Sequence, residues 1–228
     1  MHIPTACRSR RAHGARLITI RSLSPRARII LRSPKYSDVP SLTRRGNDPL
    51  CTRYVPGLRA LQGKITNETN HKQVQRWRAE SGIKAFFLVV VLLPEKESDD
   101  TEDATIGDTG LTPFDLTKKT AECGIMLNSG PSIRGKGYAV EALEMNFAFG
   151  FDHLKLETIY FDTLDENAAM RGLLEKRFRL SGQWNDKDKD WRYVATKEWW
   201  LERQTAAGEG RVEIEVEEEM LSDSERSS

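Results

Sequence analysis

The feature that most constrains the fold is a short loop with two glycines, placed between a strand-like run and a helix-like run. Residues 122–127 form the strand-like run, Gly135 and Gly137 lie in the loop 134–139, and a helical pattern follows from Val140. Glycine lets the backbone approach a ligand without side-chain collision, and the free amides and dipole of a helix N-terminus attract an anion. The sequence therefore predicts a site for a phosphorylated cofactor at this junction.

Two well-known phosphate-binding motifs do not fit this loop. The dinucleotide fingerprint needs a third glycine after Gly135 and Gly137, and the Walker loop needs a lysine followed by serine or threonine. The loop has neither continuation. A strand–helix connection without a ligand is the remaining alternative, because short glycine motifs also occur by chance.

Read from Arg134, the loop has the pattern Arg-x-x-Gly-x-Ala, which resembles the coenzyme A pyrophosphate loop of the GNAT acetyltransferase superfamily. Segments that resemble the family's third strand, fourth strand and the helix after its fifth strand follow in the family's order, at 106–111, 121–127 and 167–176. Residues 26–38 resemble the opening of the ribosomal-protein N-terminal acetyltransferase (RimJ/RimL-like) branch. The resemblance covers most of the chain. It implies an α/β GNAT fold, with a mixed, mostly antiparallel central sheet flanked by helices on both sides.

The resemblance implies that acetyl-CoA is the co-substrate and that successive parts of the chain hold its parts. The pyrophosphate is expected at the loop residues Arg134, Gly135, Lys136, Gly137, Tyr138 and Ala139. The pantetheine arm is expected along the strand end formed by Met126, Leu127 and Asn128, with Asn167 touching it. Two alternatives stay open, namely Lys136 as an exposed surface lysine and Asn167 as a helix cap.

Glu122 is the candidate general base of the implied reaction, in which an amine attacks acetyl-CoA directly. Side chains alternate along a strand, so Glu122, Gly124 and Met126 share one face. In many family members an acid at this place deprotonates the amine, often through a water. An α-amino group has a pKa of about 8, so a modest base is sufficient. The alternative for Glu122 is a strand carboxylate that forms an ion pair with a neighbouring base.

Two features depart from the family pattern. Many members carry a tyrosine as proton donor to the departing thiolate, and this chain has Leu174 at that position. Relatives usually end the same helix as Lys-Leu-Gly-Phe, whereas this chain reads Lys176-Arg177-Phe178 without the glycine. A catalytically weak or inactive CoA-binding or protein-interaction module is therefore the alternative to an active N-acetyltransferase.

Charge is distributed unevenly along the chain, although the net charge is only +1. Eight arginines and one lysine precede the first acid, Asp38, and eight acids against two arginines follow from Glu209. Such charged ends are typical of solvated tails. We expect a basic, disordered extension at 1–24, an acetyltransferase domain at 25–204 and an acidic, disordered tail at 205–228. The arginine-rich start also fits a mitochondrial transit peptide, the alternative to a cytoplasmic protein.

Composition argues against several other classes of protein. The longest apolar run, 85–93, is too short to span a membrane, and the net charge argues against nucleic-acid binding driven by bulk charge. The cysteines, Cys7, Cys51 and Cys123, and the four histidines have no ligand spacing, so no metal site is expected. The expected partners are acetyl-CoA and an amine acceptor, either a protein N-terminus or a small molecule. The sequence does not specify an oligomeric state.

Hydrophobic patterns and turn residues predict the order of helices and strands. Strands are expected at 28–32, 83–93, 106–111, 121–128 and 157–164, and helices at 37–48, 68–80, 138–154 and 166–176. A final hairpin is expected from strands at 183–184 and 191–200, with its turn at 186–190. The acidic run 95–103 is expected to be a solvated hairpin loop, and a lip that steers a cationic amine is the alternative.

Overall fold

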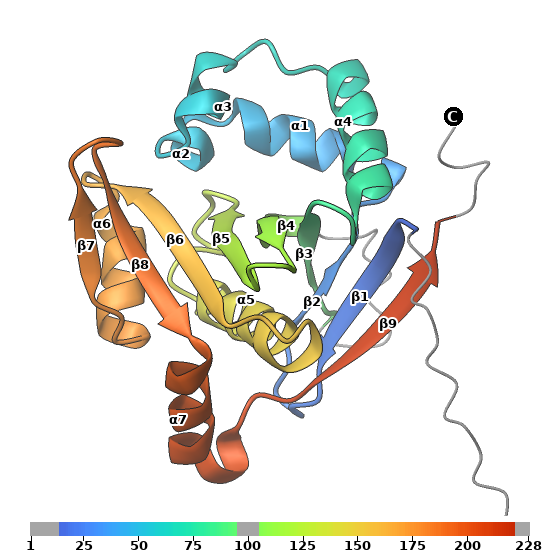
Figure 1. Ribbon diagram of the computed structural model, residues 1–228. Helices are drawn as coiled ribbons and strands as arrows, with labels where there is room; N and C mark the ends of the chain where they lie inside the picture. The colour runs from blue at the N-terminus through green and yellow to red at the C-terminus, as the bar shows by residue number, and fades with distance from the viewer. Residues whose placement is uncertain (1–13, 95–104, 222–228) are drawn as a thin grey trace, which may run out of the picture.

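The computed structural model describes residues 14–94 and 105–221, and these parts of the chain form one nine-stranded sheet with helices on both faces (Figure 1). Its strands are β1 (Arg16–Ser22), β2 (Ile29–Arg32), β3 (Phe86–Leu92), β4 (Thr105–Asp115), β5 (Thr120–Leu127), β6 (Thr158–Leu164), β7 (Gly182–Asn185), β8 (Asp190–Thr196) and β9 (Ile214–Met220). They lie in the order β7-β8-β6-β5-β4-β3-β2-β1-β9. Among these described strands only β5 and β6 run parallel, and the other neighbours are antiparallel. The predicted α/β fold with a mixed, mostly antiparallel sheet is confirmed.

The helices cover the sheet in two layers. They are α1 (Val39–Asn47), α2 (Pro49–Thr52), α3 (Pro56–Ala60), α4 (Asn67–Glu80), α5 (Tyr138–Phe147), α6 (Ala168–Gly172) and α7 (Lys197–Ala207). Short 3-10 segments, η1 (Tyr36–Asp38) and η4 (Gly208–Gly210), and π-helical segments, η2 (Ala148–His153) and η3 (Leu173–Arg177), extend or join them. The helices expected at 138–154 and 166–176 therefore each finish in a π-helical turn. Within the described ranges, every helix is too short or too polar to span a membrane.

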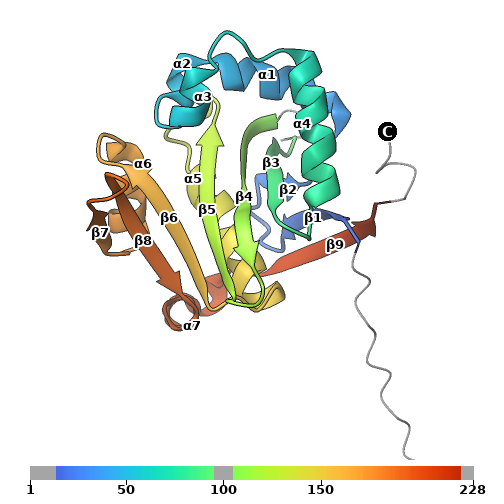
Figure 2. The same cartoon turned by 45° about the horizontal axis from the view of Figure 1, so that its top comes forward.

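Two hydrophobic cores lie on the two faces of the sheet. Side chains alternate along β3, so Phe86, Leu88 and Val90 pack into the larger core, while Val89 and Val91 pack into a smaller core with α1 and α4. Figures 1 and 2 show α1–α4 on one side of the sheet and α5 on the other. Because both of its faces are buried, β3 has a continuous apolar sequence instead of an alternating one.

The layer formed by α1–α4 covers β3 and β4 but leaves β6 and β8 uncovered (Figures 1 and 2). Along β6, Ile159 and Phe161 are fully buried in the larger core, whereas Tyr160 and Asp162 on the opposite face are only half-buried. Val194 of β8 lies on that same face and is 41% exposed. We call this uncovered side of β5, β6 and β8 the open face.

Both ends of the chain contribute strands, which corrects the prediction of disordered tails at 1–24 and 205–228. β1 pairs with β2 and, along its whole length, with β9. The physical reason is apolar burial, since Ile18 and Ile20 of β1 lie in the larger core and β9 pairs the backbone edge that β1 would otherwise expose. The folded part therefore extends beyond the predicted 25–204. The outermost residues of both predicted tails, and the acidic run after β3, lie outside the described residues.

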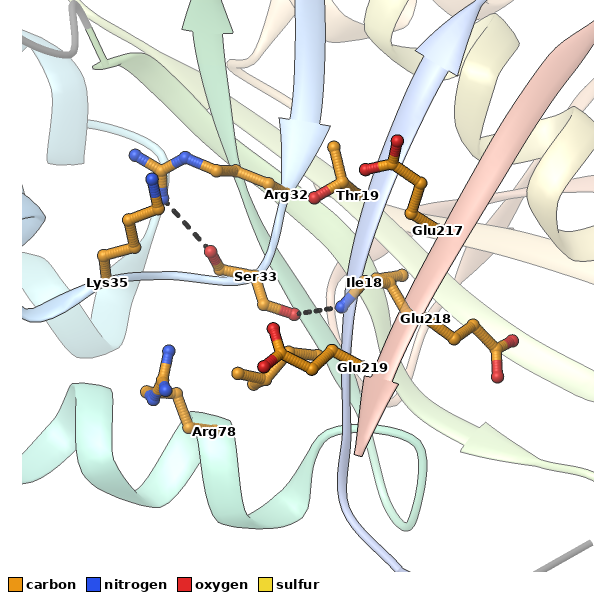
Figure 3. A pocket seen from close by; sticks show the side chains of 10 residues that line it. Ile18, Thr19, Arg32, Ser33, Lys35, Arg78, Glu217, Glu218 and Glu219 are labelled. Atoms are coloured by element: carbon orange, nitrogen blue, oxygen red, sulfur yellow. Dashed lines mark hydrogen bonds between the residues drawn. The ribbon is translucent and has the colours of Figure 1, made fainter. Parts of the chain in front are cut away.

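A pocket with a volume of ≈ 370 Å³ lies where the terminal strands meet α4 (Figure 3). At its wall the Ser33 hydroxyl accepts a hydrogen bond from the main-chain amide of Ile18 at 3.0 Å. Arg32, which also lines the pocket, forms a buried ion pair with Asp38 at 2.8 Å. Strands β3 and β4 separate this pocket from β5, so it is distinct from the site around the glycine loop.

The strand predicted over 191–200 is wrong in its second part. β8 stops at Thr196, whose side chain accepts a hydrogen bond from the main-chain amide of Trp199 at 3.2 Å. This bond caps α7 and starts a helix where the sequence pattern predicts a strand. The helix places Trp200, which is 1% exposed, in the larger core. The predicted hairpin turn between β7 and β8 is confirmed.

Candidate active site

The glycine loop has a backbone geometry that depends on its two glycines. Gly135 has a φ of 73° and Gly137 a φ of 86°, both in the left-handed region that other residues rarely adopt. Gly137 is also the N-cap of α5. A Cβ atom at Gly135 would meet no atom within 4 Å. The backbone angle, and not crowding, is therefore what favours glycine there.

Most main-chain amides between the glycine loop and the first turn of α5 are unpaired within the described part of the chain. The first amides after the loop that are paired are those of Val140 and Glu141, which donate to the Gly137 carbonyl at 3.0 and 3.2 Å. The amides of residues 135–139 have no acceptor among the described residues. The amide of Arg134 differs from these, because it donates to the Gly130 carbonyl, which precedes the loop, at 3.0 Å. Unpaired amides beside the positive end of a helix form an anion site.

Arg28 lies just before β2, and its side chain fixes the glycine loop through hydrogen bonds. Its Nη1 donates to the Lys136 carbonyl at 2.7 Å, and its Nε donates to Glu141 Oε2 at 3.0 Å. The guanidinium also lies 4.7 Å from the centroid of the Tyr138 ring. A carbonyl and the next amide point in opposite directions across one planar trans peptide. By binding the Lys136 carbonyl, Arg28 turns the Gly137 amide toward the opposite side, where an anion can bind.

The side chains of the two basic loop residues have different surroundings. Arg134 Nη2 donates to the main-chain carbonyl of Leu50 at 3.2 Å, so Arg134 links the loop to α2. Lys136 is exposed, and its side chain has no partner among the described residues. Lys136 is thus a solvated surface lysine, and its contact with a phosphate stays a prediction.

A basic groove runs beside the first turns of α5. Its volume is ≈ 740 Å³, and its lining includes Arg26, Arg28 and Arg177. Its two carboxylates are already paired, Glu141 with Arg28 at 2.9 Å and Glu144 with an arginine of α7 at 2.7 Å. The excess positive charge next to the glycine loop suits the phosphates of a nucleotide.

Helix α2 is fixed to the end of β5 by Asp48. The carboxylate of Asp48 accepts from the Leu50 amide at 2.8 Å and from the Ser129 hydroxyl at 2.6 Å. The bond from Ser129 is the main reason that the pKa of Asp48 is lowered. The Cys51 thiol donates to the Leu127 carbonyl at 3.4 Å, and burial raises the pKa of this thiol to about 11. Helix α2 therefore forms a wall over the end of β5.

Strands β5 and β6 separate after three parallel pairs. Their pairing runs from Thr120 opposite Thr158 to Glu122 opposite Tyr160, and the described residues show no pairing beyond that point. Beyond Glu122 the backbones of β5 and β6 diverge (Figure 2), and we call the region along the unpaired edge of β5 the gap. An extended ligand can use the unpaired edge of a strand in such a gap.

The register between β4 and β5 decides which amides face this gap. The Asn128 amide donates to the carbonyl of Ile106 on the β4 side, at 2.8 Å. In an antiparallel pair alternate residues bond to the same neighbour, so Met126 and Asn128 face β4 while Ile125 and Leu127 face the gap. Of the three residues predicted on this strand, Leu127 is the one whose main-chain amide faces the gap, and pantetheine binding there stays a prediction. The amide of Ile125, which the sequence pattern does not single out, faces the gap as well.

The Asn128 side chain belongs to a hydrogen-bond network that connects α1 to the sheet. Its Oδ1 accepts from Arg45 Nη1 at 2.9 Å, and its Nδ2 donates to the Thr105 carbonyl at 3.3 Å. Arg45 also pairs with Asp108 of β4 at 2.7 Å. Burial raises the pKa of Asp108, although the charge of Arg45 opposes the shift. These contacts give Asn128 a structural role in fixing α1 over the end of β5.

Glu122 lies on the open face, at the point where the gap begins. It is half-buried and has no hydrogen-bond or ion-pair partner among the described residues. Burial, and after it the negative charge of Asp162, raise the pKa of the Glu122 carboxyl. The nearby Arg192 is engaged with Asp162 through two hydrogen bonds, of 2.7 and 2.6 Å. Glu122 is therefore not an ion-paired strand carboxylate, and its role as general base stays a prediction.

Asn167 caps helix α6, which is one of its two expected roles. Its Oδ1 accepts from the Met170 amide at 3.2 Å, and its Nδ2 donates to the Thr163 hydroxyl at 3.0 Å. These bonds hold the side chain beside β6. Contact between Asn167 and a pantetheine arm stays a prediction.

The helix end that lacks the family's glycine closes through η3. Leu174, at the position of the expected tyrosine, is fully buried in the larger core. Phe178 is also fully buried, with its ring centroid 5.3 Å from that of Phe147. Arg179 adopts the left-handed conformation, with a φ of 58°, that glycine usually provides at a helix end. The aromatic packing at this end is therefore complete without the missing glycine.

Comparisons with known proteins agree with this geometry. Residues 28–177, more than half of the chain, match the family model of an acetyltransferase (GNAT) domain. No curated protein matches the sequence.

Solved structures share the fold at low sequence identity. A GNAT-family acetyltransferase from Bacillus anthracis is 20% identical, with 79% of this chain and 99% of that chain covered and a TM-score of 0.59. RimJ from Mycobacterium smegmatis, in complex with CoA-disulfide, is 18% identical, with 87% and 96% covered and a TM-score of 0.62. Spermidine N-acetyltransferase from Vibrio cholerae, in complex with CoA and spermine, is 17% identical, with 76% and 98% covered and a TM-score of 0.61.

The GNAT family uses acetyl-CoA as co-substrate, which confirms the predicted co-substrate class. The RimJ/RimL-like branch stays a prediction, because likeness at this identity shows the fold alone. On the family match and the shared fold, this chain belongs to the GNAT acetyltransferase family.

Proposed function

We propose that this chain is an acetyl-CoA-dependent N-acetyltransferase that transfers the acetyl group directly to a primary amine in a ternary complex. The observation that carries the proposal is the position of Glu122. It is a half-buried carboxylate without a partner among the described residues, and it stands where β5 and β6 begin to separate. A base, an open strand edge and an anion site thus follow one another along β5.

From this order we infer where each part of acetyl-CoA binds. The pyrophosphate takes the unpaired amides of residues 135–139, and the basic groove with Arg26 and Arg177 accommodates the remaining phosphate. The pantetheine arm lies in the gap and bonds to the main chain of Leu127 and Ile125. The thioester then comes close to Glu122, where the gap begins.

The chemistry needs a neutral amine near the thioester. An α-amino group has a pKa of about 8 and is largely protonated at neutral pH. The raised pKa of Glu122 makes its carboxylate a stronger base than an ordinary glutamate. The ammonium first loses a proton to solvent and gives the neutral amine. The amine nitrogen then bonds to the carbonyl carbon, the carbon–sulfur bond breaks, and Glu122 takes the one proton that the nitrogen loses. Holding both reactants in one gap supplies much of the acceleration.

The charge of the open face supports an amine as acceptor. Arg192 is paired with Asp162, so Glu122 and Asp190 leave this face with excess negative charge. A cationic ammonium group is attracted to such a surface. The acceptor is accordingly a protein N-terminus or a small amine, and we place the chain in the RimJ/RimL-like branch on the resemblance of residues 26–38.

A GNAT-fold protein that binds CoA without turnover is the second candidate function. One observation favours it. Leu174 is buried in the core at the position where many family members carry a proton-donating tyrosine. Under this alternative the chain binds acetyl-CoA but transfers no acetyl group.

Release of the CoA thiol in the presence of spermidine, or of a synthetic peptide with a free N-terminus, tests the proposal. The wild-type chain should release thiol in proportion to the amine consumed. Glu122→Gln should lower kcat by about 100-fold while the Kd of acetyl-CoA stays unchanged. Glu68→Gln, at an exposed pair with Lys72 on α4, is the matched control and should keep full activity. Tight acetyl-CoA binding without thiol release by the wild type would favour the second candidate.

A further inference from the structure

The proposed reaction leaves a thiolate that needs a proton, and the usual donor position does not provide one. Leu174 has no acidic group and is fully buried in the larger core. A donor must lie close to the place where the carbon–sulfur bond breaks, which the proposed function puts near Glu122. Tyr160 is directly opposite Glu122 in the last parallel pair before the gap.

Tyr160 points to the same side of the sheet as Glu122. Its neighbours Ile159 and Phe161 are fully buried in the larger core, so the Tyr160 side chain lies on the open face, where it is half-buried. Adjacent strands lie about 4.8 Å apart, so Tyr160 on β6 and Glu122 on β5 are direct neighbours on this face. Among the described residues, the Tyr160 hydroxyl has no hydrogen-bond partner. It is therefore free to bond to a group that enters the gap.

The ring of Tyr160 is held in place by a charged pair on the same face. The Arg192 guanidinium lies 4.8 Å from the ring centroid, and two hydrogen bonds to Asp162 fix that guanidinium. A cation over the ring face contacts the aromatic ring and leaves the hydroxyl unoccupied. The arrangement therefore orients the phenol at the beginning of the gap.

Burial and the neighbouring carboxylates keep the phenol of Tyr160 protonated. Burial, and after it the negative charge of Glu122, raise the pKa of the Tyr160 hydroxyl, with Asp162 adding to the shift and Arg192 opposing it. At neutral pH the hydroxyl is therefore a proton donor and not a phenolate.

Resting on the proposed function, we propose that Tyr160 donates the proton to the CoA thiolate as the acetyl group leaves. The amine nitrogen bonds to the acetyl carbon and the carbon–sulfur bond breaks. Glu122 takes one proton from the nitrogen, and the sulfur takes the phenolic proton. The protonated Glu122 then returns its proton to the Tyr160 phenolate on the neighbouring strand, so both residues regain their starting states.

Tyr160→Phe tests this role, because it removes the hydroxyl and keeps the ring. We expect kcat for acetyl transfer to spermidine or to the free-N-terminus peptide to fall by about 100-fold. The Kd of acetyl-CoA and the Tm should stay unchanged. The matched control is Tyr36→Phe, an exposed ring that stacks on His71 away from the site, and it should keep wild-type activity.

A second substrate separates proton donation from a structural role. S-acetyl-4-nitrothiophenol releases a far more acidic thiol that does not need a proton. The ratio of kcat/KM between wild type and Tyr160→Phe should therefore approach one with this thioester. An equal loss with both thioesters, or no loss with acetyl-CoA, would overturn the role of Tyr160 while leaving the proposed function intact. A wild-type chain that binds acetyl-CoA but acetylates neither amine would overturn both.

Discussion

The two halves of the sheet differ in how their faces are covered. On β3 both faces are buried, with Leu88 in the larger core and Val89 in the smaller one, each fully inaccessible to solvent. On β6 only one face is buried, and Tyr160 and Asp162 remain half-exposed on the other. The boundary between these halves is β5, and this strand carries Glu122.

This difference in coverage determines where a site can form in such a sheet. A second helical layer over β6 would bury Glu122 and close the gap, whereas no layer at all would leave the carboxylate fully solvated. The layer α1–α4 instead ends over the last part of β5, where Arg45 and Asn128 fix α1. Glu122, four residues before Met126, is therefore half-buried, and its pKa is raised while access is kept.

The largest effect expected from this comparison is on stability. Val89→Asp puts an unpaired carboxylate into the smaller core and should cost more than about 4 kcal/mol of unfolding free energy. Val194→Asp makes the same change on the open face and should cost less than about 1 kcal/mol. Urea unfolding of both variants measures the difference. Similar losses at the two positions would show that the faces of the two halves are not differently covered.

The stability of the half of the sheet that contains β1–β4 also depends on its edge strand, β9. Removing residues 212–228 deletes β9, which pairs with all of β1, and exposes the apolar contacts of Ile214 and Val216. We expect a loss of about 3 kcal/mol and a Tm lower by about 10 °C. Removing only 222–228 is the matched control. An unchanged Tm in the longer truncation would mean that β9 does not stabilise the sheet.

A smaller effect is expected on the binding of acetyl-CoA at the glycine loop. Arg28→Ala removes the bond to the Lys136 carbonyl and should weaken acetyl-CoA binding about tenfold. Arg28→Lys should recover only part of the affinity, because an ammonium cannot bond to Lys136 and Glu141 and also stack on Tyr138. Calorimetry measures both. The control is Arg21→Ala, at an exposed 3.8 Å pair with Glu217, and equal losses in control and test would contradict the role of Arg28.

The smallest effect is a pH-dependent change in stability at Glu122. Its pKa in the folded chain is raised, mainly by burial. Between the unfolded and the folded pKa the folded chain binds more protons, so this group destabilises the fold as pH rises through that window. Glu122→Gln should therefore raise the Tm at pH 8 and have little such benefit at pH 4.

Glu68 provides the comparison of opposite sign. Its pKa is lowered, chiefly by the hydrogen bond from Lys72, so its contribution is present above the unfolded pKa and is lost as pH falls. Glu68→Gln should lower the Tm at pH 8 slightly and not at pH 4. The same sign of change at both positions would contradict the burial of Glu122.

The features that the sequence predicted are those encoded by neighbouring residues. Gly135 and Gly137 mark the loop because their left-handed angles are local properties of the backbone. Strand alternation placed Glu122 on a face different from that of Cys123, and Cys123 is indeed buried in the larger core. The capping role of Asn167, kept as an alternative, also follows from a local pattern.

The features that it missed depend on contacts between distant segments. Arg28 bonds to Lys136, which lies far along the chain, and no local pattern indicates that contact. Whether the amide of Asn128 faces β4 or the gap depends on a register that alternation alone does not fix. In β9 the run of glutamates obscures the alternation of Ile214 and Val216, so a paired edge strand resembles a solvated tail.

Calorimetric titration with acetyl-CoA, of the wild-type chain beside a variant with Gly135→Val and Gly137→Val, tests whether the glycine loop binds the co-substrate. The control is Gly63→Val, which strains an equally left-handed glycine, with a φ of 75°, in a different loop. We expect binding by the wild type and the control, and a loss of at least about 100-fold in affinity in the double variant. No binding by a folded wild-type chain, or equal binding by the double variant, would contradict an acetyl-CoA site at the glycine loop.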